Sequence, residues 1–593
     1  SSREAHAKQK VLAKERKASK PNADSIARSK KIWERLRLKS HVPREERKQL
    51  VEELFDIIQG RIKDFVFKHD SVRVVQCALK YANMTQRRMI ANELKGEFIT
   101  LAESRYAKFL VAKLVVEGDK DIQNMIIAEF HGHVRKMINH PEASWILDDI
   151  YRQVATKDQK AVLLKEWYGP EYAIFKASEK EKRTATLSDI LEEAPEKRKP
   201  MLSYLYNLIN QLVQKKLTGF TMLHDAMLQY YLNCKPGSEE ATEFLELLKG
   251  QGDEEEKDHD LLKNLAFTAS GARIVCMALA YGAAKDRRYI LKVYKDMIEI
   301  LAQDIHGHGI LLAAYDVIDD TVMISKAIFP ELIGKGDEPS QQADTITALA
   351  NHPTGRIALL YPFASATTAL PKALLSEADM IMIKAIHDIR TTTSKKDPAV
   401  RRQELVRGLS SSLLATVASQ ASTLAQTVFG CYFITEVLLA AEGDSTAAFK
   451  AVATLVQGDP GEEAHIARNP SSGRMLKTLV QGGHFDPKEK TVRQVRPSGD
   501  FCTLLFEKMK GHLLQWATGS GAFIVLALVE QDGWIGKEAL LKSLGSERAA
   551  LKKAIKRAES DAAATPKETS KEHSKSGQKA AVAGMKLLLE RLD

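Results

Sequence analysis

The 593-residue sequence has little of what marks secreted, membrane-spanning or disordered proteins. Its five cysteines are scattered, odd in number and without a CxxC pair, which excludes a disulfide scaffold and favours a reducing compartment. No run approaches the roughly 20 consecutive apolar residues that a membrane span needs. Residues 1–30 also lack the apolar segment of a secretory signal. With 44% hydrophobic and 28% charged residues, the chain is too apolar to remain disordered.

Signals for β-strands are also scarce, because alternating β-branched runs bounded by Asn-Gly or Asp-Gly turns are hard to find. The chain exceeds the size of one ordinary core, so it forms either several domains or an extended repeat array. Its first residue is Ser1 and not methionine, from which we expect a segment of a longer polypeptide.

Positive charge is concentrated at the N-terminus. The formal net charge is +10, and residues 1–50 hold 16 Lys+Arg against 6 Asp+Glu, so this arm carries the whole surplus. A basic arm on a near-neutral body adds affinity for phosphates without reading sequence. The alternative is a solvated tail without a binding role. The arm residues expected to contact phosphates are Lys8, Lys10, Lys14, Arg16, Lys17, Lys30, Lys31, Arg35 and Arg37.

An internal repeat runs along the chain. Residues 71–96 and 271–296 share nine identical positions in an alignment without gaps, and Arg87/Arg287 is one of these pairs. Further copies begin at 107, 143 and 308, with spacings of 35 or 36 residues within each group. Weaker copies begin near Phe220, Gly355, Cys431, Gly473 and Gly521.

Each copy is typical of a helix, a short polar turn and a second helix. The sequence therefore predicts an all-α fold, an α-solenoid of about 10–12 helical repeats in which each unit buries its apolar face against its neighbours. One continuous arc and two arms bent near 176–200 both remain open.

The helix that contains Val72 presents several side chains on one face. Val72, Arg73 and Gln76 lie at i, i+1 and i+4 and are expected to share this face. Val74 and Ala78 point the other way, into the stack. Two side chains one turn apart can hydrogen-bond the edge of a flat base while their neighbour stacks on its face.

The segment 69–96, HDSVRVVQCALKYANMTQRRMIANELKG, resembles a repeat of the Pumilio-type (Puf) RNA-binding family. In that family the positions of Val72 and Gln76 read a base edge, and the position of Arg73 stacks between bases. Such repeats take one base each. The whole arrangement is most similar to the divergent nucleolar Puf-A branch with its Penguin-like C-terminal region. The basic arm leads into Lys30-Lys31-Ile32-Trp33-Glu34, and a few near-standard repeats precede a long degenerate half.

Most repeats depart from the family's base-reading code. In register with Gln76 the other copies carry Val111, Leu147, His224, Cys276, Leu312, Leu359, Thr435, Lys477 and Val525. Each good bidentate base contact is worth about 1–3 kcal/mol of discrimination, and most of these residues cannot make one. We therefore expect little sequence specificity.

The stacking position is more often basic. It carries Arg73, Lys108, Arg273, Arg356 and Arg474, which we interpret as a row of cations at ~10 Å spacing, suited to phosphates or to guanidinium stacking on bases. The alternative is a set of solvated charges or internal salt bridges. Arg105 completes the predicted RNA-contacting residues.

Catalytic and metal-binding signatures are absent from the sequence. The stretches His131–His133 and His306–His308 lack a cysteine or carboxylate in register to complete a zinc site, so we interpret them as structural turns. Residues 334–337 do not have the spacing of a phosphate loop. We expect no enzyme, no metal, no cofactor and no small-molecule substrate.

The resemblance implies a nuclear, mostly nucleolar, RNA-binding scaffold in the assembly of the large ribosomal subunit. Its partners would be structured pre-rRNA, large-subunit ribosomal proteins and assembly factors, with no membrane. Two alternatives remain open: a sequence-specific mRNA-binding translational regulator, and a protein-binding helical scaffold of the armadillo or HEAT type.

Four regions are predicted along the chain. They are a basic arm (1–45), N-terminal Puf-type repeats (46–176), C-terminal Puf-type repeats (177–558) that include a Penguin-like region at about 383–510, and a flexible tether with a short terminal helix, Ala580–Leu592 (559–593).

Overall fold

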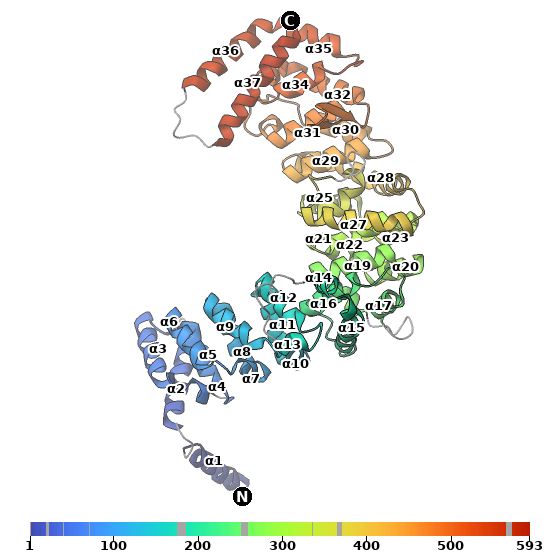
Figure 1. Cartoon of the computed structure of the whole chain (residues 1–593). Helices are drawn as coiled ribbons and strands as arrows, with labels where there is room; N and C mark the ends of the chain where they lie inside the picture. The colour runs from blue at the N-terminus through green and yellow to red at the C-terminus, as the bar shows by residue number, and fades with distance from the viewer. Residues whose placement is uncertain are drawn as a thin grey trace. The chain divides into compact units, whose positions relative to one another are not determined.

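The computed structural model describes residues 2–18, 23–38, 41–69, 71–174, 186–250, 259–334, 336–364, 371–564 and 572–592. Almost all of their regular secondary structure is helical, which confirms the predicted all-α solenoid (Figure 1). The described part contains one antiparallel hairpin, β1 (Gly483–Asp486) and β2 (Thr491–Gln494), in which Gly483 pairs with Gln494.

The chain divides into two compact units, Ser1–Leu247 and Leu248–Asp593, and the boundary falls within the last turn of helix α17 (Glu239–Lys249). The division falls after the stretch 176–200, where the sequence left a bend between two arms open. Residues 175–185 of that stretch lie outside the described part of the chain. The helices of the first unit are α1 (Ser2–Ala18), α2 (Ala23–Leu36), α3 (Arg44–Ile58), α4 (Ile62–Val66), α5 (Val72–Tyr81), α6 (Met84–Glu93), α7 (Phe98–Glu103), α8 (Lys108–Glu117), α9 (Lys120–Phe130), α10 (Val134–Ile138), α11 (Ala143–Gln153), α12 (Lys157–Lys165), α13 (Glu171–Ile174), α14 (Leu187–Glu193), η2 (Pro195–Lys197), α15 (Arg198–Gln214), α16 (Thr221–Leu232) and α17 (Glu239–Lys249).

The second unit continues the pattern of short and long helices and adds two long ones, α27 and α28. Its helices are α18 (Asp260–Leu265), α19 (Ala269–Tyr281), α20 (Ala284–Val293), α21 (Ile298–Gln303), α22 (His308–Val317), α23 (Thr321–Ala327), α24 (Phe329–Leu332), α25 (Pro339–Asn351), α26 (Gly355–Ala364), α27 (Glu377–Thr393), α28 (Pro398–Leu424), α29 (Val428–Ala440), α30 (Thr446–Thr454), η3 (Ile466–Arg468), α31 (Pro470–Gln481), α32 (Gly499–Met509), η4 (Lys510–His512), α33 (Leu513–Thr518), α34 (Ala522–Val529), α35 (Lys537–Ser546), α36 (Arg548–Ala564) and α37 (Glu572–Leu592).

Glutamates link successive repeats at the turn that precedes a short helix. The carboxylate comes from 31 to 35 residues further along and accepts two backbone N–H groups of the turn, at N···O distances of 2.6–3.3 Å. These donors have no partner within their own helix, so the next repeat satisfies them. The acceptors and their donors are Glu93 (Gly60, Ile62), Glu129 (Gly96, Phe98), Glu166 (Gly132, Val134) and Glu331 (Asp296, Ile298).

Left-handed backbone makes this turn possible. Gly96 and Gly132 have φ of 88° and 87°, a region that glycine enters without steric cost. Asp296 occupies the same place in the second unit with φ of 65°.

Arginines also link successive repeats, by contacting the C-terminal end of a helix in the next repeat. Arg87 Nη1 donates to the carbonyl oxygen of Glu117 at 2.8 Å, and Arg287 Nη1 donates to that of Val317 at 2.7 Å. Both acceptors lie at the last turn of a helix in the next repeat, where carbonyls lack intrahelical partners. Burial lowers the pKa of Arg287, and the guanidinium is compensated by several carbonyl groups. The repeated arginine of the sequence therefore has a structural role.

The predicted basic arm is partly folded onto the body. Ile32 and Leu36 of α2 are buried, and α2 packs against α3 and α5. Arg28 pairs with Glu53 at 2.5 Å, and Arg35 pairs with Glu46 at 2.6 Å. Arg35 therefore has a carboxylate partner on α3, and its contact with phosphates stays a prediction.

The C-terminal residues also differ from the prediction. Helix α36 extends to Ala564 and α37 begins at Glu572, so the described part of the predicted tether is helical. Met585 and Leu588 are buried, and α37 packs on α34 and α36. Lys586 pairs with Glu559 at 2.7 Å.

Among the described residues, no single helix is long and apolar enough to cross a bilayer. Residues Gly499–Thr518 and Ala522–Val529, bent by 116° at their junction, pass that test only as a pair and only on length and composition. Most residues of Ala522–Val529 are buried in the second unit.

Replacing Glu129 with alanine removes both acceptors from the turn at Gly96 and Phe98. The two hydrogen bonds are exposed and part-buried, and a typical one contributes about 0.5–1.5 kcal/mol net, so we expect the free energy of unfolding to fall by about 1–3 kcal/mol. Urea unfolding followed by circular dichroism measures the change. Glu52→Ala, at an exposed site of α3, is the matched control and should stay within about 0.5 kcal/mol of the parent. Equal stability of the two variants would contradict the role of Glu129.

Candidate nucleic-acid interface

The structure corrects the register of the first three repeats. Helix α8 begins 36 residues after α5, at Lys108 and Val72 respectively. The buried positions agree with this spacing, because one exposed residue precedes two buried ones in each helix. Phe109, and not Lys108, is therefore the equivalent of Arg73, and Trp145 is the equivalent in α11. The sequence alignment was wrong by one residue at these two repeats.

Arg73, Phe109 and Trp145 form an exposed row, which we call the stacking row. Phe109 is 55% exposed and Trp145 is 56% exposed, and the Arg73 side chain is exposed as well. Their helices α5, α8 and α11 pack in succession in the blue and teal part of the chain (Figure 1). Helix packing places equivalent residues about 10 Å apart. The row therefore offers a guanidinium and two aromatic rings to flat groups on consecutive repeats.

Base-edge readers are scarce beside this row. Val72 is 1% exposed, so its predicted contact with a base is wrong: the side chain packs in the core. Gln76 is half-buried and its Nε2 donates to the carbonyl oxygen of Tyr106 at 3.4 Å. At the equivalent position α8 has Ala112, which cannot hydrogen-bond. In α11 it has Asp148, which is buried and accepts the N–H of Met222 at 3.0 Å.

The residues predicted in register with Gln76 in other repeats are mostly core residues. Their burial supports the inference that they read no base. The buried ones are Val111, Leu147, His224, Cys276, Leu312, Leu359, Thr435 and Val525.

Lys108 and Arg105 have neighbours that alter their predicted roles. Lys108 Nζ lies 2.5 Å from Glu142, and its side chain is 18% exposed. The hydrogen bond from Lys108 is the main cause that lowers the pKa of Glu142. Lys108 therefore forms a salt bridge within the protein. This was the alternative interpretation of the basic residues at the stacking position. Arg105 is exposed, with its guanidinium 5.7 Å from the Tyr106 ring centre.

In the second unit only part of the equivalent face is accessible. Arg273 and Arg474 are exposed. Arg356 is half-buried with its guanidinium 4.3 Å above the Phe429 ring, and burial lowers the pKa of Arg356. The equivalent residue in α22, Gly309, is covered by Met382 of α27.

The remaining arm residues lie on α1 and α2. Lys8, Lys10 and Arg16 of α1 are exposed, while the side chains of Lys14 and Lys17 lie outside the described part. On α2, Lys31 is exposed and Lys30 is half-buried. Arg37 lies just beyond α2, with its guanidinium 5.5 Å from the Trp33 ring centre.

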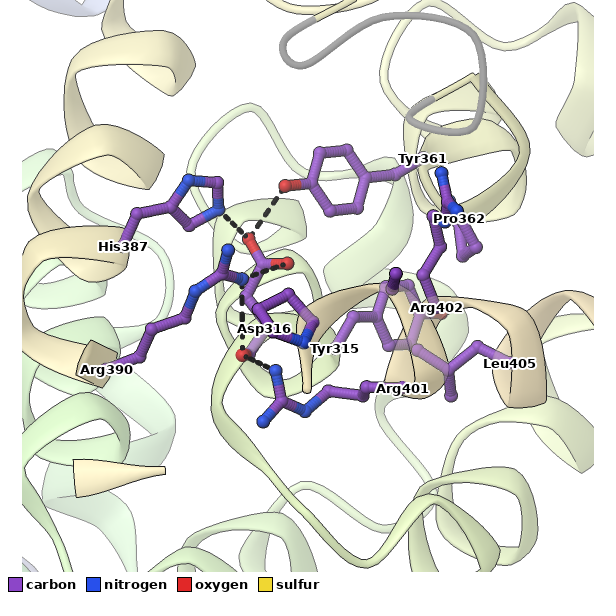
Figure 2. A pocket seen from close by; sticks show the side chains of 11 residues that line it. Tyr315, Asp316, Tyr361, Pro362, His387, Arg390, Arg401, Arg402 and Leu405 are labelled. Atoms are coloured by element: carbon purple, nitrogen blue, oxygen red, sulfur yellow. Dashed lines mark hydrogen bonds and ion pairs between the residues drawn. The ribbon is translucent and has the colours of Figure 1, made fainter. Parts of the chain in front are cut away.

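A polar cavity of about 220 Å³ in the second unit is a weaker candidate site (Figure 2). At its centre the Asp316 carboxylate accepts Tyr361 Oη at 2.7 Å and His387 Nε2 at 2.8 Å, and it pairs with Arg390 at 3.2 Å. All three groups that contact the Asp316 carboxylate belong to the protein itself. The carboxylate therefore stabilises the packing of α22, α26 and α27.

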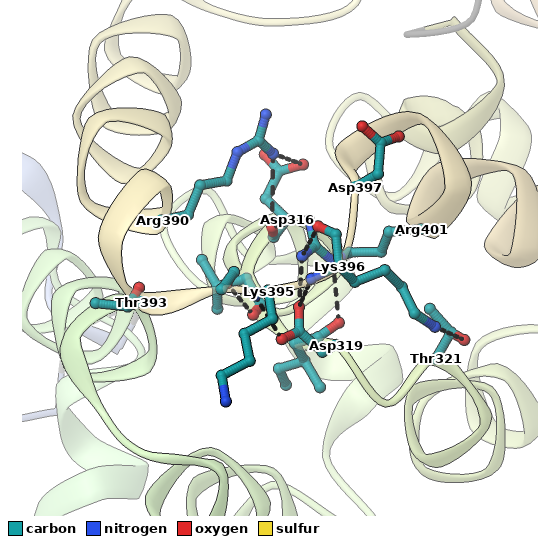
Figure 3. Close-up of polar contacts among 12 residues, drawn as sticks. Asp316, Asp319, Thr321, Arg390, Thr393, Lys395, Lys396, Asp397 and Arg401 are labelled. Atoms are coloured by element: carbon teal, nitrogen blue, oxygen red, sulfur yellow. Dashed lines mark hydrogen bonds and ion pairs between the residues drawn. The ribbon is translucent and has the colours of Figure 1, made fainter.

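The neighbouring cluster anchors the link between α27 and α28 (Figure 3). Arg401 is buried and donates to the Asp316 carbonyl at 2.7 Å and to Asp319 at 2.6 Å. Asp319 in turn accepts the backbone N–H groups of Lys395 and Lys396. A buried charge paired in this way holds structure and is not available to a ligand.

Both His-Gly-His stretches occupy turns before helices. Gly132 has φ of 87° ahead of α10, and Gly307 precedes α22. His308 Nε2 lies 3.0 Å from Asp379 of α27; this pairing raises the pKa of His308 against the effect of burial, and lowers that of Asp379. Among the described residues, no group of three or more His, Cys, Asp or Glu side chains could hold a metal ion.

Comparisons with known proteins agree with the repeat architecture. The sequence profile of the CPL (NUC119) domain matches residues 351–491, which overlaps the predicted Penguin-like region but begins and ends earlier. Pumilio homology domain family member 6 of Schizosaccharomyces pombe is 32% identical over 549 residues, which are 93% of this chain and 81% of the relative. Pumilio homolog 3 of Homo sapiens is 30% identical over 532 residues, 88% of this chain and 76% of the relative.

A solved structure resembles most of the chain. The crystal structure of human Puf-A in complex with DNA superposes with a TM-score of 0.74 and 29% identity, and covers 91% of this chain and 99% of that chain. A structure of human Puf-A alone gives the same TM-score with 28% identity.

Truncating the stacking row should weaken binding to single-stranded nucleic acid. Base–aromatic stacking is worth about 1–3 kcal/mol per base, so Phe109→Ala and Trp145→Ala should each raise the Kd for a 12-nucleotide oligouridylate by about 5- to 150-fold. Fluorescence anisotropy at fixed salt measures the Kd. Val116→Ala, at an exposed apolar site of α8 outside the row, should leave it unchanged. An unchanged Kd in the Phe109→Ala/Trp145→Ala double variant would rule out the row as the interface.

Proposed function

The chain belongs to the Pumilio-homology (Puf) family and to its Puf-A-like branch, and from this premise we propose that it is an RNA-binding scaffold that holds RNA with little sequence specificity. The observation that carries the proposal is the stacking row, three exposed stacking side chains on consecutive repeats, of which only Arg73 has an amide reader, Gln76, beside it. Stacking accepts every base, because every base has a π face.

Two further observations support binding without a base code. The surplus of positive charge lies in residues 1–50, and a charge of that kind attracts phosphates irrespective of sequence. The related Puf-A structure was solved in complex with DNA, and stacking and phosphate contacts are chemically available from DNA and RNA alike. We propose a binding protein and not an enzyme.

We further propose that the RNA is pre-rRNA and that the protein acts in nucleolar assembly of the large ribosomal subunit. The support is membership of the Puf-A-like branch together with the mode of binding. Precursor rRNA exposes many single-stranded loops between helices, and a code-free stacking surface is able to hold loops of differing sequence. The degenerate second unit, with its covered α22 face, is then available to ribosomal proteins and assembly factors.

Two other functions make different predictions. A translational regulator of mRNA needs sequence discrimination, which the buried or substituted reader positions do not favour. A protein-binding scaffold of the armadillo or HEAT type needs no nucleic-acid surface, and the exposed Phe109 and Trp145 rings do not distinguish it from the proposed function. Salt dependence separates these classes, since counterion release is specific to phosphate contacts.

The code-free proposal predicts similar affinity for a Puf-type recognition element and for a scrambled RNA of equal length. We expect less than about 100-fold preference, equivalent to about 2.7 kcal/mol. We also expect a log–log salt slope of about −0.7 for each single-strand phosphate contact. Titrations at several salt concentrations measure both. A larger preference would favour the mRNA regulator, and undetectable binding at low salt would favour the protein scaffold.

The nucleolar proposal predicts which RNA the protein contacts in cells. Ultraviolet crosslinking followed by sequencing of the attached fragments should recover mainly precursor rRNA of the large subunit. The Phe109→Ala/Trp145→Ala variant is the matched control and should lose most of these fragments at equal expression. Recovery dominated by mature mRNA would contradict the assembly role.

A further inference from the structure

A cavity of about 280 Å³ lies where α2 docks on the first clear repeat. Its walls come from three parts of the first unit: the C-terminal end of α2 and the residue that follows it, the exposed face of α5, and one side chain of α8. The lining residues are Trp33, Leu36, Arg37, Arg73, Gln76, Cys77, Lys80, Tyr81 and Lys113. We call this cavity the arm pocket. The sequence did not indicate this pocket, or that Trp33 and Arg73 both line it.

The charge of the arm pocket is of one sign. Four of its lining residues are cations, and no aspartate or glutamate is among them. In this respect it differs from the surroundings of Lys108 and Arg35, where a carboxylate faces each cation. Four cations around one cavity repel each other, and an anion that enters relieves this repulsion.

Two of the cations, Lys80 and Lys113, lie at the same wall of the pocket. Lys113 Nζ donates to the carbonyl oxygen of Gln76 at 3.2 Å, so its ammonium reaches across from α8 to α5. Burial raises the pKa of the Cys77 thiol to about 11, while the nearby charges of Lys113 and Lys80 act in the opposite direction. Both ammonium groups therefore lie near the same thiol at the pocket wall.

Aromatic rings supply the second kind of surface. Trp33 and Tyr81 are both half-buried, and Tyr81 Oη donates to the Leu36 carbonyl at 3.3 Å, which ties α5 to the end of α2. The Arg28–Glu53 and Arg35–Glu46 pairs hold α2 against α3. The walls of the pocket are therefore ordered before a ligand binds, and binding does not carry the entropic cost of ordering them.

We propose that the arm pocket binds one nucleotide unit of single-stranded nucleic acid, with the phosphate among Lys80, Lys113 and Arg37 and the base against Trp33. This inference rests on the proposed function and adds to it a subsite that adjoins the stacking row at Arg73. The assignment follows from chemistry: cations without carboxylates select a phosphate, and an adjacent indole selects a flat base. A cavity of this size admits one nucleotide and not a helical duplex.

Removing the two lysines tests the phosphate part. Lys80→Gln/Lys113→Gln should raise the Kd for a 12-nucleotide oligouridylate by about 10-fold and reduce the magnitude of the salt slope by about 0.7 for each lost phosphate contact. Lys95→Gln/Lys120→Gln is the matched control, because it removes the same charge from exposed sites outside the pocket, and it should change the Kd less than about 2-fold. Circular dichroism checks that both double variants are folded.

Photocrosslinking tests the base part directly. Irradiation of the full chain with the same oligouridylate, followed by peptide mass spectrometry, should give uridine adducts at Trp33 or Tyr81 in addition to adducts at Phe109 or Trp145. Parallel reactions with and without a 5′-phosphate distinguish the source of the phosphate. Adducts with both oligonucleotides indicate an internal phosphodiester, and adducts with only the phosphorylated one indicate a chain end.

Two results would overturn this inference in distinguishable ways. Adducts confined to Phe109 and Trp145, with equal affinity of the Lys80→Gln/Lys113→Gln variant and its control, would refute the arm pocket and leave the proposed function intact. Absence of saturable binding by the parent protein at low salt would refute both.

Discussion

The structure depends on one constraint: a single repeat cannot satisfy the backbone groups at its own ends. Glu93, Glu129, Glu166 and Glu331 each supply two acceptors to a turn in the preceding repeat. Arg87 and Arg287 supply donors to the last carbonyls of a helix in the following one. Apolar faces would hold neighbouring repeats together without fixing how far one slides along the next, whereas these bidentate contacts fix that register.

Because the register between repeats is fixed, equivalent sequence positions in successive repeats line up and form a surface. Because α5, α8 and α11 keep the same relation, the exposed residue that precedes two buried ones in the first turn of each helix lines up on one exposed face, where Arg73, Phe109 and Trp145 form the stacking row. The same regularity leaves room for additions at particular repeats. Helix α2 covers the start of the first unit and forms the arm pocket, whereas α27 covers Gly309 and closes the equivalent face of α22.

The sequence was sufficient for the fold class, the existence of the repeats, the exposed Arg73 and Arg273, and the loss of base readers. It was insufficient for register at 107–111 and 143–147, because apolar residues flank the exposed one and a slip of one residue still gives an apolar core pattern. It also hid the docking of α2, since the charge of the arm obscures the short apolar stripe of Ile32 and Leu36. The identity of Arg87 and Arg287 was visible, but its meaning needed the carbonyl acceptors 30 residues away.

The reach of the glutamate contacts has a consequence for synthesis on the ribosome. Each of these four turns receives its carboxylate from 31 to 35 residues downstream. At roughly 5–20 residues per second, a newly made turn waits about 2 to 7 s before its partner is even translated. During that interval the nascent chain carries one unfinished repeat, and each added repeat completes the one before it. During synthesis, therefore, only the most recently made repeat lacks its carboxylate partner. The position of that incomplete repeat moves along the chain as the chain grows.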